Sequence, residues 1–173
     1  MTRNNLVSFI WFLAVSCPSL STAAAATVTR VLDGDTVEVT QNNNTVRVRL
    51  IDIDAPEKSQ PYGQRARQRL SALVKGASAV DVESKGKDAY GRVLGRLWLK
   101  VCSDRCTTKD AGSEMVENGF AWAYRYKGKA SSISMLELEQ AARKSRFGLW
   151  QDVNAVEPWK WRQSHKHKER TIQ

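Results

Sequence analysis

The sequence predicts an α+β fold in which a small five-stranded β-barrel is accompanied by about three helices. Three observations predict it. Short stretches of alternating apolar and polar residues, rich in Val and Thr, come first and are separated by polar turns. A stretch with apolar residues at helical spacing interrupts these strands, and further helical stretches follow the last strand.

The first three strands are predicted as a meander over residues 27–32, 36–40 and 45–53. The residues between the first two strands, 33–35, read Asp-Gly-Asp, which is typical of a tight turn. In the third strand, alternation places Val48 and Leu50 on one face and Arg49 on the other. Pro56 ends that strand.

A helix is predicted over Gly63–Lys75, because Ala66, Leu70 and Leu73 repeat at helical spacing. Two more strands, a short helix and a longer helix follow, at residues 77–83, 92–101, 112–118 and 131–146. This order of elements indicates an OB-fold-like barrel, a class that often binds nucleic acid. We expect one domain over residues 27–161 and a basic, disordered tail over 162–173.

The first 26 residues have the organisation of a secretory signal peptide. Arg3 precedes an apolar run at 6–15, and the alanines at 24–26 offer a cleavage site before Thr27. The run is shorter than the roughly 20 residues that a membrane-spanning helix needs. Lipid attachment at Cys17 is an alternative. We therefore expect a secreted or periplasmic protein, with no stable membrane association after signal cleavage.

Cysteine usage agrees with export. Cys102 and Cys106 remain after signal cleavage, and such a pair can close a small loop as a disulfide in an oxidising compartment. A zinc site would need further soft ligands, and His165 and His167 stand far away in the charged tail. The spacing also differs from the C-x-x-C of redox dithiols.

The chain is strongly basic, with 27 Lys and Arg against 18 Asp and Glu and a net charge of +9. This charge favours a polyanionic partner, which could be nucleic acid, anionic lipid or acidic glycan. A hydrophobic share of 42% excludes wholesale disorder, because it suffices for a packed core.

Three charged clusters could carry chemistry. The turn Asp33-Gly34-Asp35-Thr36 sets two carboxylates where oxygen ligands could hold Ca²⁺ or Mg²⁺. Residues 49–57 place an arginine and several acids at the end of a strand, and residues 88–92 place a tyrosine beside an arginine. Taken singly, the first cluster is better explained as an ordinary Asp-Gly turn, and the other two also fit a solvated strand edge and a hairpin cap.

Together and in this order, the clusters resemble the thermonuclease family, typified by staphylococcal nuclease. The matching segments are Asp33-Gly34-Asp35-Thr36-Val37, Arg49-Leu50 followed by Asp54-Ala55-Pro56-Glu57, and Tyr90-Gly91-Arg92. The segments at 124–126 and 147–150 are also similar to the family, so the resemblance extends from Thr27 to about Trp161.

The resemblance implies a Ca²⁺ site beside a phosphate-binding site. Asp35 and Asp54 would provide carboxylate ligands, and the backbone carbonyl of Ala55 would be a third ligand. The type member has Thr where this chain has Ala55, and a backbone ligand does not depend on that difference. Glu57 would position or deprotonate the attacking water. Arg49 and Arg92 would hold the scissile phosphate, which suits paired hydrogen bonds from a guanidinium.

Two tyrosines complete the implied site. Tyr90 and Tyr124 match family tyrosines that contact nucleotide phosphate or base, and Asp33 and Thr36 would shape the metal turn. We therefore expect a secreted, calcium-dependent nuclease that hydrolyses DNA and RNA with little sequence specificity and leaves 3′-phosphates. The alternative is a non-catalytic nucleic-acid-binding OB-fold module. The sequence carries no indication of oligomeric state.

Overall fold

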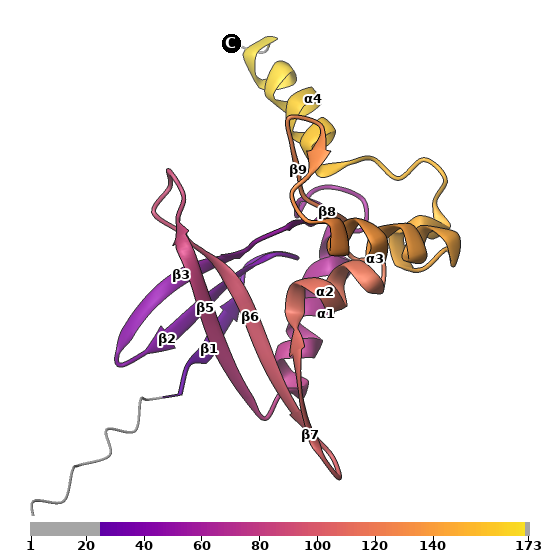
Figure 1. The fold of residues 1–173 in the computed structure, drawn as a ribbon. Helices are drawn as coiled ribbons and strands as arrows, with labels where there is room; N and C mark the ends of the chain where they lie inside the picture. The colour runs from indigo at the N-terminus through magenta and orange to yellow at the C-terminus, as the bar shows by residue number, and fades with distance from the viewer. Residues whose placement is uncertain (1–24, 172–173) are drawn as a thin grey trace, which may run out of the picture.

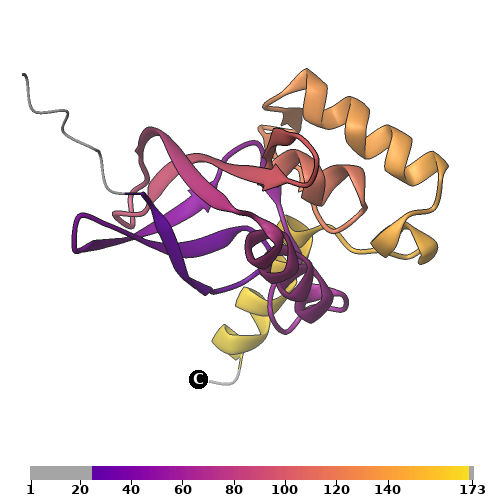
Figure 2. The same cartoon turned by 90° about the horizontal axis from the view of Figure 1, so that it is seen from below.

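The computed structural model describes residues 25–171, in which a strongly curved sheet packs beside three helices and a fourth helix projects from one end (Figure 1). The expected signal peptide lies outside the described residues except for Ala25 and Ala26, and Cys17 lies outside them as well. Figure 2 shows from a second direction that helices gather on one side of the sheet.

The main sheet is mixed. Its strands are β1 (Thr27–Val31), β2 (Thr36–Gln41), β3 (Asn44–Leu50), β5 (Ala79–Lys87), β6 (Val93–Cys102) and β7 (Cys106–Asp110). The order is β1-β2-β3-β6-β5, with β7 beside β6. β3 and β6 run parallel, with Arg49 opposite Leu94, whereas the other ladders of this sheet are antiparallel.

Two short ladders stand apart from the main sheet. β4 (Ile53–Asp54) pairs with β8 (Trp122–Ala123), and β9 (Arg125–Tyr126) pairs with β10 (Lys129–Ala130). The sequence analysis predicted none of these separately, because two-residue strands leave no alternation to detect.

The α+β class is confirmed, but the expected five-stranded barrel is corrected to a curved six-stranded sheet without a closing ladder. The two ends of the strand order meet at one bridge, between Ala26 and Val80. A closed barrel requires strand pairing all the way round. Bulges in β1 and β5 add curvature to the sheet. The sheet still stays open, because within the described residues β1 pairs only with β2 and the single bridge to β5 comes from Ala26, the residue before β1.

Residues 25–171 contain four α-helices where we expected about three. They are α1 (Gly63–Gly76), α2 (Ala111–Glu117), α3 (Ile133–Lys144) and α4 (Pro158–Thr171), with a 3₁₀ helix, η1 (Gly148–Gln151), between the last two. Asp110 and Ser132 cap α2 and α3, because their side chains accept backbone N–H groups of the first turn.

The main core lies between the sheet and α1–α3. Fully buried side chains from every one of these elements meet there, including Val37, Val48, Leu50, Leu97, Leu70, Met115 and Met135. Burial of Val48 and Leu50 confirms the predicted inner face of the third strand. This core fixes the strand ends and turns from which the polar residues described below project.

α4 replaces the disordered tail that we expected over 162–173, up to Thr171. Pro158 suits the first helical turn because a proline lacks the N–H that would be unpaired there. Lys160 donates to Glu157 at 2.8 Å, and the Trp161 ring stacks on His165 at 3.9 Å between centroids. No helix within the described residues is long and apolar enough to span a membrane.

Cys102 and Cys106 form a disulfide in the structure. They are paired residues at the end of the β6–β7 hairpin, with Cα atoms 4.0 Å apart. In Figure 1 this hairpin end is at the bottom and α4 is at the top. The disulfide therefore closes a hairpin at the opposite end of the molecule from α4.

Candidate active site

The candidate site begins where the third predicted strand breaks. We expected one strand over 45–53, but β3 ends at Leu50 and β4 begins at Ile53. Between them Asp52 has a φ of +62°, a left-handed conformation that Asp adopts more readily than most residues. The break turns the chain away from β6, so that Asp54 pairs with Trp122 of β8.

Asp52 is the anchor of this break. Arg96 and Ser131 donate to its two carboxylate oxygens at 2.8 and 2.9 Å, and the N–H of Tyr124 donates to its carbonyl at 2.8 Å. Arg96 also contacts Asp110, the cap of α2. The sequence analysis missed this role, because the partners of Asp52 stand 44 and 79 residues away in the chain.

The turn between β1 and β2 brings Asp35 to the same segment. The N–H of Ala55 donates to Asp35 Oδ2 at 2.7 Å, and the N–H of Leu50 donates to the Asp35 carbonyl at 2.8 Å. Asp33 shapes the turn by accepting the N–H of Asp35 at 3.0 Å, and the Thr36 hydroxyl donates to Asp35 Oδ1 at 3.0 Å.

Gly34 allows this close approach. A Cβ atom at this position would lie 2.6 Å from the Cβ of Ala55 and 2.8 Å from the Cβ of Ala66. Both distances are well inside van der Waals contact, which is about 3.5–4.0 Å between carbon atoms. The turn therefore packs against both α1 and the Asp54–Ala55 segment only with glycine in this place.

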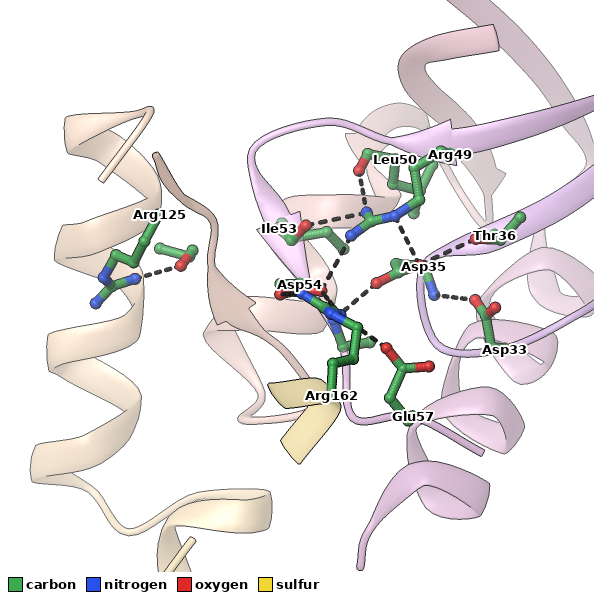
Figure 3. A network of polar contacts seen from close by, with 12 residues as sticks. Asp33, Asp35, Thr36, Arg49, Leu50, Ile53, Asp54, Glu57, Arg125 and Arg162 are labelled. Carbon is green, nitrogen blue, oxygen red and sulfur yellow. Dashed lines mark hydrogen bonds and ion pairs between the residues drawn. The ribbon is translucent and has the colours of Figure 1, made fainter. Parts of the chain in front are cut away.

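The guanidinium of Arg49 lies between the two buried carboxylates (Figure 3). Its Nε is 3.1 Å from Asp35 Oδ1, and its Nη2 is 3.1 Å from Asp54 Oδ1. Its Nη1 donates to the carbonyls of Leu50 and Ile53 at 2.6 and 3.0 Å. A guanidinium has five N–H groups, so these contacts leave one N–H free, on Nη2.

Burial dominates the electrostatics of the acidic pair. It raises the pKa of Asp35 above the usual value, although Arg49 opposes the rise. Burial also raises the pKa of Asp54, against a hydrogen bond from Arg162, and the charge of Asp35 adds to the rise. Holding both groups ionised therefore depends on positive charge close by.

Glu57 extends the acidic group toward solvent. Its side chain is 38% exposed, and its Oε1 accepts a hydrogen bond from Arg162 Nη1 at 2.7 Å. Arg162 comes from α4 and also contacts both carboxylate oxygens of Asp54, at 3.1 and 2.8 Å. We had placed Arg162 in the tail, and no local sequence signal indicates a contact 108 residues away.

The connection from β5 to β6 carries Arg92, the second of the two arginines expected to bind phosphate. Arg92 donates through Nε to Asp88 Oδ2 at 2.7 Å, and its guanidinium carbon lies 5.6 Å from the Tyr90 ring centroid. Burial opposes ionisation of Asp88, but hydrogen bonds from Arg92 and Tyr90 together lower its pKa. Within the described residues no other carboxylate pairs with Arg92, so its two Nη groups have no ion-pair partner.

One cleft of about 690 Å³ collects the residues that the sequence analysis singled out. Its lining includes Asp35, Arg49, Asp54, Ala55, Glu57, Tyr90, Arg92 and Tyr124. Tyr90 is 86% exposed and Tyr124 is 37% exposed, so both rings are accessible to a ligand. Arg162 and Lys166 of α4 also line the cleft, and we had assigned neither of them to the site.

The donor set fits a hard cation. Asp35 and Asp54 provide oxygen atoms only, and a divalent ion would supply the positive charge that their burial demands. No cluster of three or more His, Cys, Asp or Glu side chains with metal-binding geometry occurs in the described part of the chain. Any cation held here therefore needs further oxygen ligands, such as the Ala55 carbonyl and water.

Comparison with known proteins decides the family. A model of the family described as staphylococcal nuclease homologue matches residues 47–152. The chain belongs to this family. It is similar to a micrococcal nuclease of Shigella flexneri, with 49% identity over 142 residues, which is 81% of each chain.

Two relatives from Escherichia coli extend the similarity. Protein ParB is 49% identical over 137 residues, covering 78% of this chain and 77% of that protein. An uncharacterized endonuclease is 38% identical over 157 residues, covering 91% of this chain and 94% of that protein. The resemblance drawn from the three charged clusters is thus confirmed, and membership of the staphylococcal nuclease homologues supports nuclease activity on nucleic acids.

A single methyl group at Gly34 should disrupt the site of this nuclease homologue. We expect Gly34→Ala to lower the free energy of unfolding by roughly 1–3 kcal/mol, since the new Cβ must displace Ala55 or Ala66. Gly76→Ala is the matched control, because its Cβ would meet no atom within 4 Å and alanine favours a helix. Urea unfolding of both variants measures the difference; equal stability would contradict the packing described here.

Proposed function

We propose that this nuclease homologue is a calcium-dependent endonuclease that hydrolyses DNA and RNA with little sequence specificity and leaves 3′-phosphates. The observation that carries the proposal is the buried pair Asp35 and Asp54, which lies in one cleft with Glu57, Arg49 and Arg92. A binding module would need a basic groove and stacking aromatics, but not buried carboxylates.

Asp35, Asp54 and the Ala55 carbonyl would hold Ca²⁺. The all-oxygen donor set supports a hard cation over zinc or copper. When bound, the cation supplies Lewis-acid stabilisation of the negative charge that grows on the phosphate during attack. The buried carboxylates fix its position, because Arg49, Thr36 and the Ala55 N–H hold their oxygens in place.

Glu57 orients the attacking water and accepts its proton. Its carboxylate is partly exposed at the cleft, where a water molecule can reach it, and its backbone N–H is held by Gln60 at 3.1 Å. The oxygen of the water forms a bond to phosphorus, and the bond from phosphorus to the 5′-oxygen breaks. The 5′-oxygen takes a proton from solvent water and leaves as a hydroxyl, so the phosphate stays on the 3′ side.

Arg92 and Arg49 have different roles toward the phosphate. Arg92 has both Nη groups available and binds the phosphate oxygens as a paired donor. Arg49 has most of its N–H groups engaged by Asp35, Asp54 and two carbonyls, so it positions the acidic pair and offers one remaining N–H to phosphate. Charge that develops in the transition state strengthens both contacts.

The low sequence specificity follows from the kind of contact that the cleft offers. Phosphate contacts carry no direct information on base identity, and stacking on rings such as Tyr90 and Tyr124 tolerates every base. We further propose a secreted or periplasmic location. The signal-like residues 1–26 and the Cys102–Cys106 disulfide support it, because disulfides persist in oxidising compartments.

Purified protein should cleave plasmid DNA and single-stranded RNA in millimolar-range Ca²⁺, and excess chelator should stop both reactions because the carboxylates then lack their cation. End labelling of the products should find 3′-phosphates and 5′-hydroxyls. Full activity in chelator would contradict the cation site. Binding of nucleic acid without any cleavage would favour the OB-fold binding module instead.

Arg92→Ala and Glu57→Gln should each reduce turnover by about 10²-fold or more, because each removes a group that acts in the transition state. Both side chains lie at the cleft surface, so the free energy of unfolding should change by only about 1 kcal/mol. Arg47→Ala and Glu137→Gln make the same changes at exposed positions away from the cleft and should keep full turnover. Near-normal kcat in Arg92→Ala would exclude the phosphate role.

A further inference from the structure

Arg162 makes a contact that the proposed chemistry does not use. Its guanidinium is bidentate on Asp54 and reaches Glu57 at the same time, with distances of 2.7–3.1 Å (Figure 3). Asp54 and Glu57 are two of the three acidic side chains to which the proposed function gives a direct role. Arg162 lies on α4, beyond residues 47–152 that the family model matches.

We propose that Arg162 is an internal competitor for the divalent cation, so that α4 blocks the cleft until cation and guanidinium exchange on Asp54 and Glu57. The inference rests on the cation site of the proposed function. It adds a regulatory contact to that site and identifies the residue that makes it.

The geometry makes the two occupants mutually exclusive. Both oxygens of Asp54 accept from Arg162, and one of them also accepts from Arg49. A calcium ion binds carboxylate oxygens at about 2.3–2.6 Å, which would place it directly against the guanidinium. Two cations at such a distance repel strongly, especially beside a buried group.

The charges of the cleft also favour replacement of Arg162 by a divalent cation over departure of Arg162 with nothing in its place. Asp35, Asp54 and Glu57 face the positive charges of Arg49 and Arg162. An arginine guanidinium stays protonated in proteins, so Arg162 keeps its positive charge while it pairs with Asp54 and Glu57. Removing it without a substitute would leave Asp54 buried with less compensation, whereas a divalent ion replaces its charge.

The attachment of α4 permits the exchange. The start of the helix is held to the domain by Trp159, which packs on Trp122, Trp150 and their neighbours, and by Gln60, which donates to the Val156 carbonyl at 2.6 Å. Farther along α4, the ion pairs of Arg162 connect the helix to the acidic residues. Lys166, one turn farther along, also lines the cleft, and in Figure 1 the C-terminal end of α4 extends away from the sheet.

Calorimetric titration with CaCl₂ tests the competition without relying on catalysis. Arg162→Gln should tighten the apparent Ca²⁺ affinity about fivefold, or about 1 kcal/mol at 1.4 kcal/mol per tenfold, because the competing state is lost. Arg162→Lys should give a smaller shift, since an ammonium lacks the bidentate fork. Lys160→Gln removes the same charge from an exposed position of α4 and should change affinity less than twofold.

Hydrogen exchange of the α4 amides provides a second readout. Addition of Ca²⁺ should speed exchange in α4 of the wild-type protein, whereas α4 of Arg162→Gln should exchange fast with or without Ca²⁺. Equal affinity shifts in Arg162→Gln and Lys160→Gln, or α4 exchange that Ca²⁺ leaves unchanged in the wild type, would overturn the competition.

Asp54→Asn separates this failure from failure of the cation site itself. If the wild-type protein binds Ca²⁺ and Asp54→Asn does not, the site holds, and an unchanged affinity in Arg162→Gln overturns the competition alone. If the wild-type protein binds no Ca²⁺, or Asp54→Asn binds it equally well, the result contradicts both the proposed cation site and the competition.

Discussion

The burial of two carboxylates side by side is the constraint on which the rest of the site depends. Asp35 and Asp54 are both almost fully buried, and burial raises the pKa of each. A protein interior tolerates such a pair only when positive charge and hydrogen-bond donors lie within reach. Arg49 meets that need from one side and Arg162 from the other, where we propose that a divalent cation can take its place.

Much of the local architecture serves to hold this pair. The β1–β2 turn can approach the Asp54–Ala55 segment because Gly34 has no Cβ. The chain turns away from β6 after β3, where Asp52 is fixed by Arg96 and Ser131. Buried residues of the sheet and α1–α3 keep these turns in place. The catalytic groups that we propose are thus set by rigid elements, which is what precise placement requires.

The sequence predicted features that short-range patterns encode. Alternation found five of the six strands of the main sheet but not β7, helical spacing found α1 and α3, and the order of three charged clusters indicated the family. It failed where distant contacts decide the structure. Alternation runs through residues 45–53 without marking the break at Asp52, whose partners lie on β6 and before α3.

Helix α4 is the clearest case of this limit. Its sequence is polar and basic and lacks an apolar stripe, so it reads as a tail, and it contacts the domain through Trp159 and Arg162. The two edges of the curved sheet show the same dependence, because the single bridge between Ala26 and Val80 leaves no trace in the sequence pattern of β1 or β5.

A crystal structure of the protein grown with Ca²⁺, with the ion located by its anomalous signal, tests the central claim most directly. The account predicts one ion at about 2.3–2.6 Å from carboxylate oxygens of Asp35 and Asp54 and from the Ala55 carbonyl, with Arg162 displaced from Asp54. An anomalous peak elsewhere, with Arg162 still paired to Asp54, would contradict it.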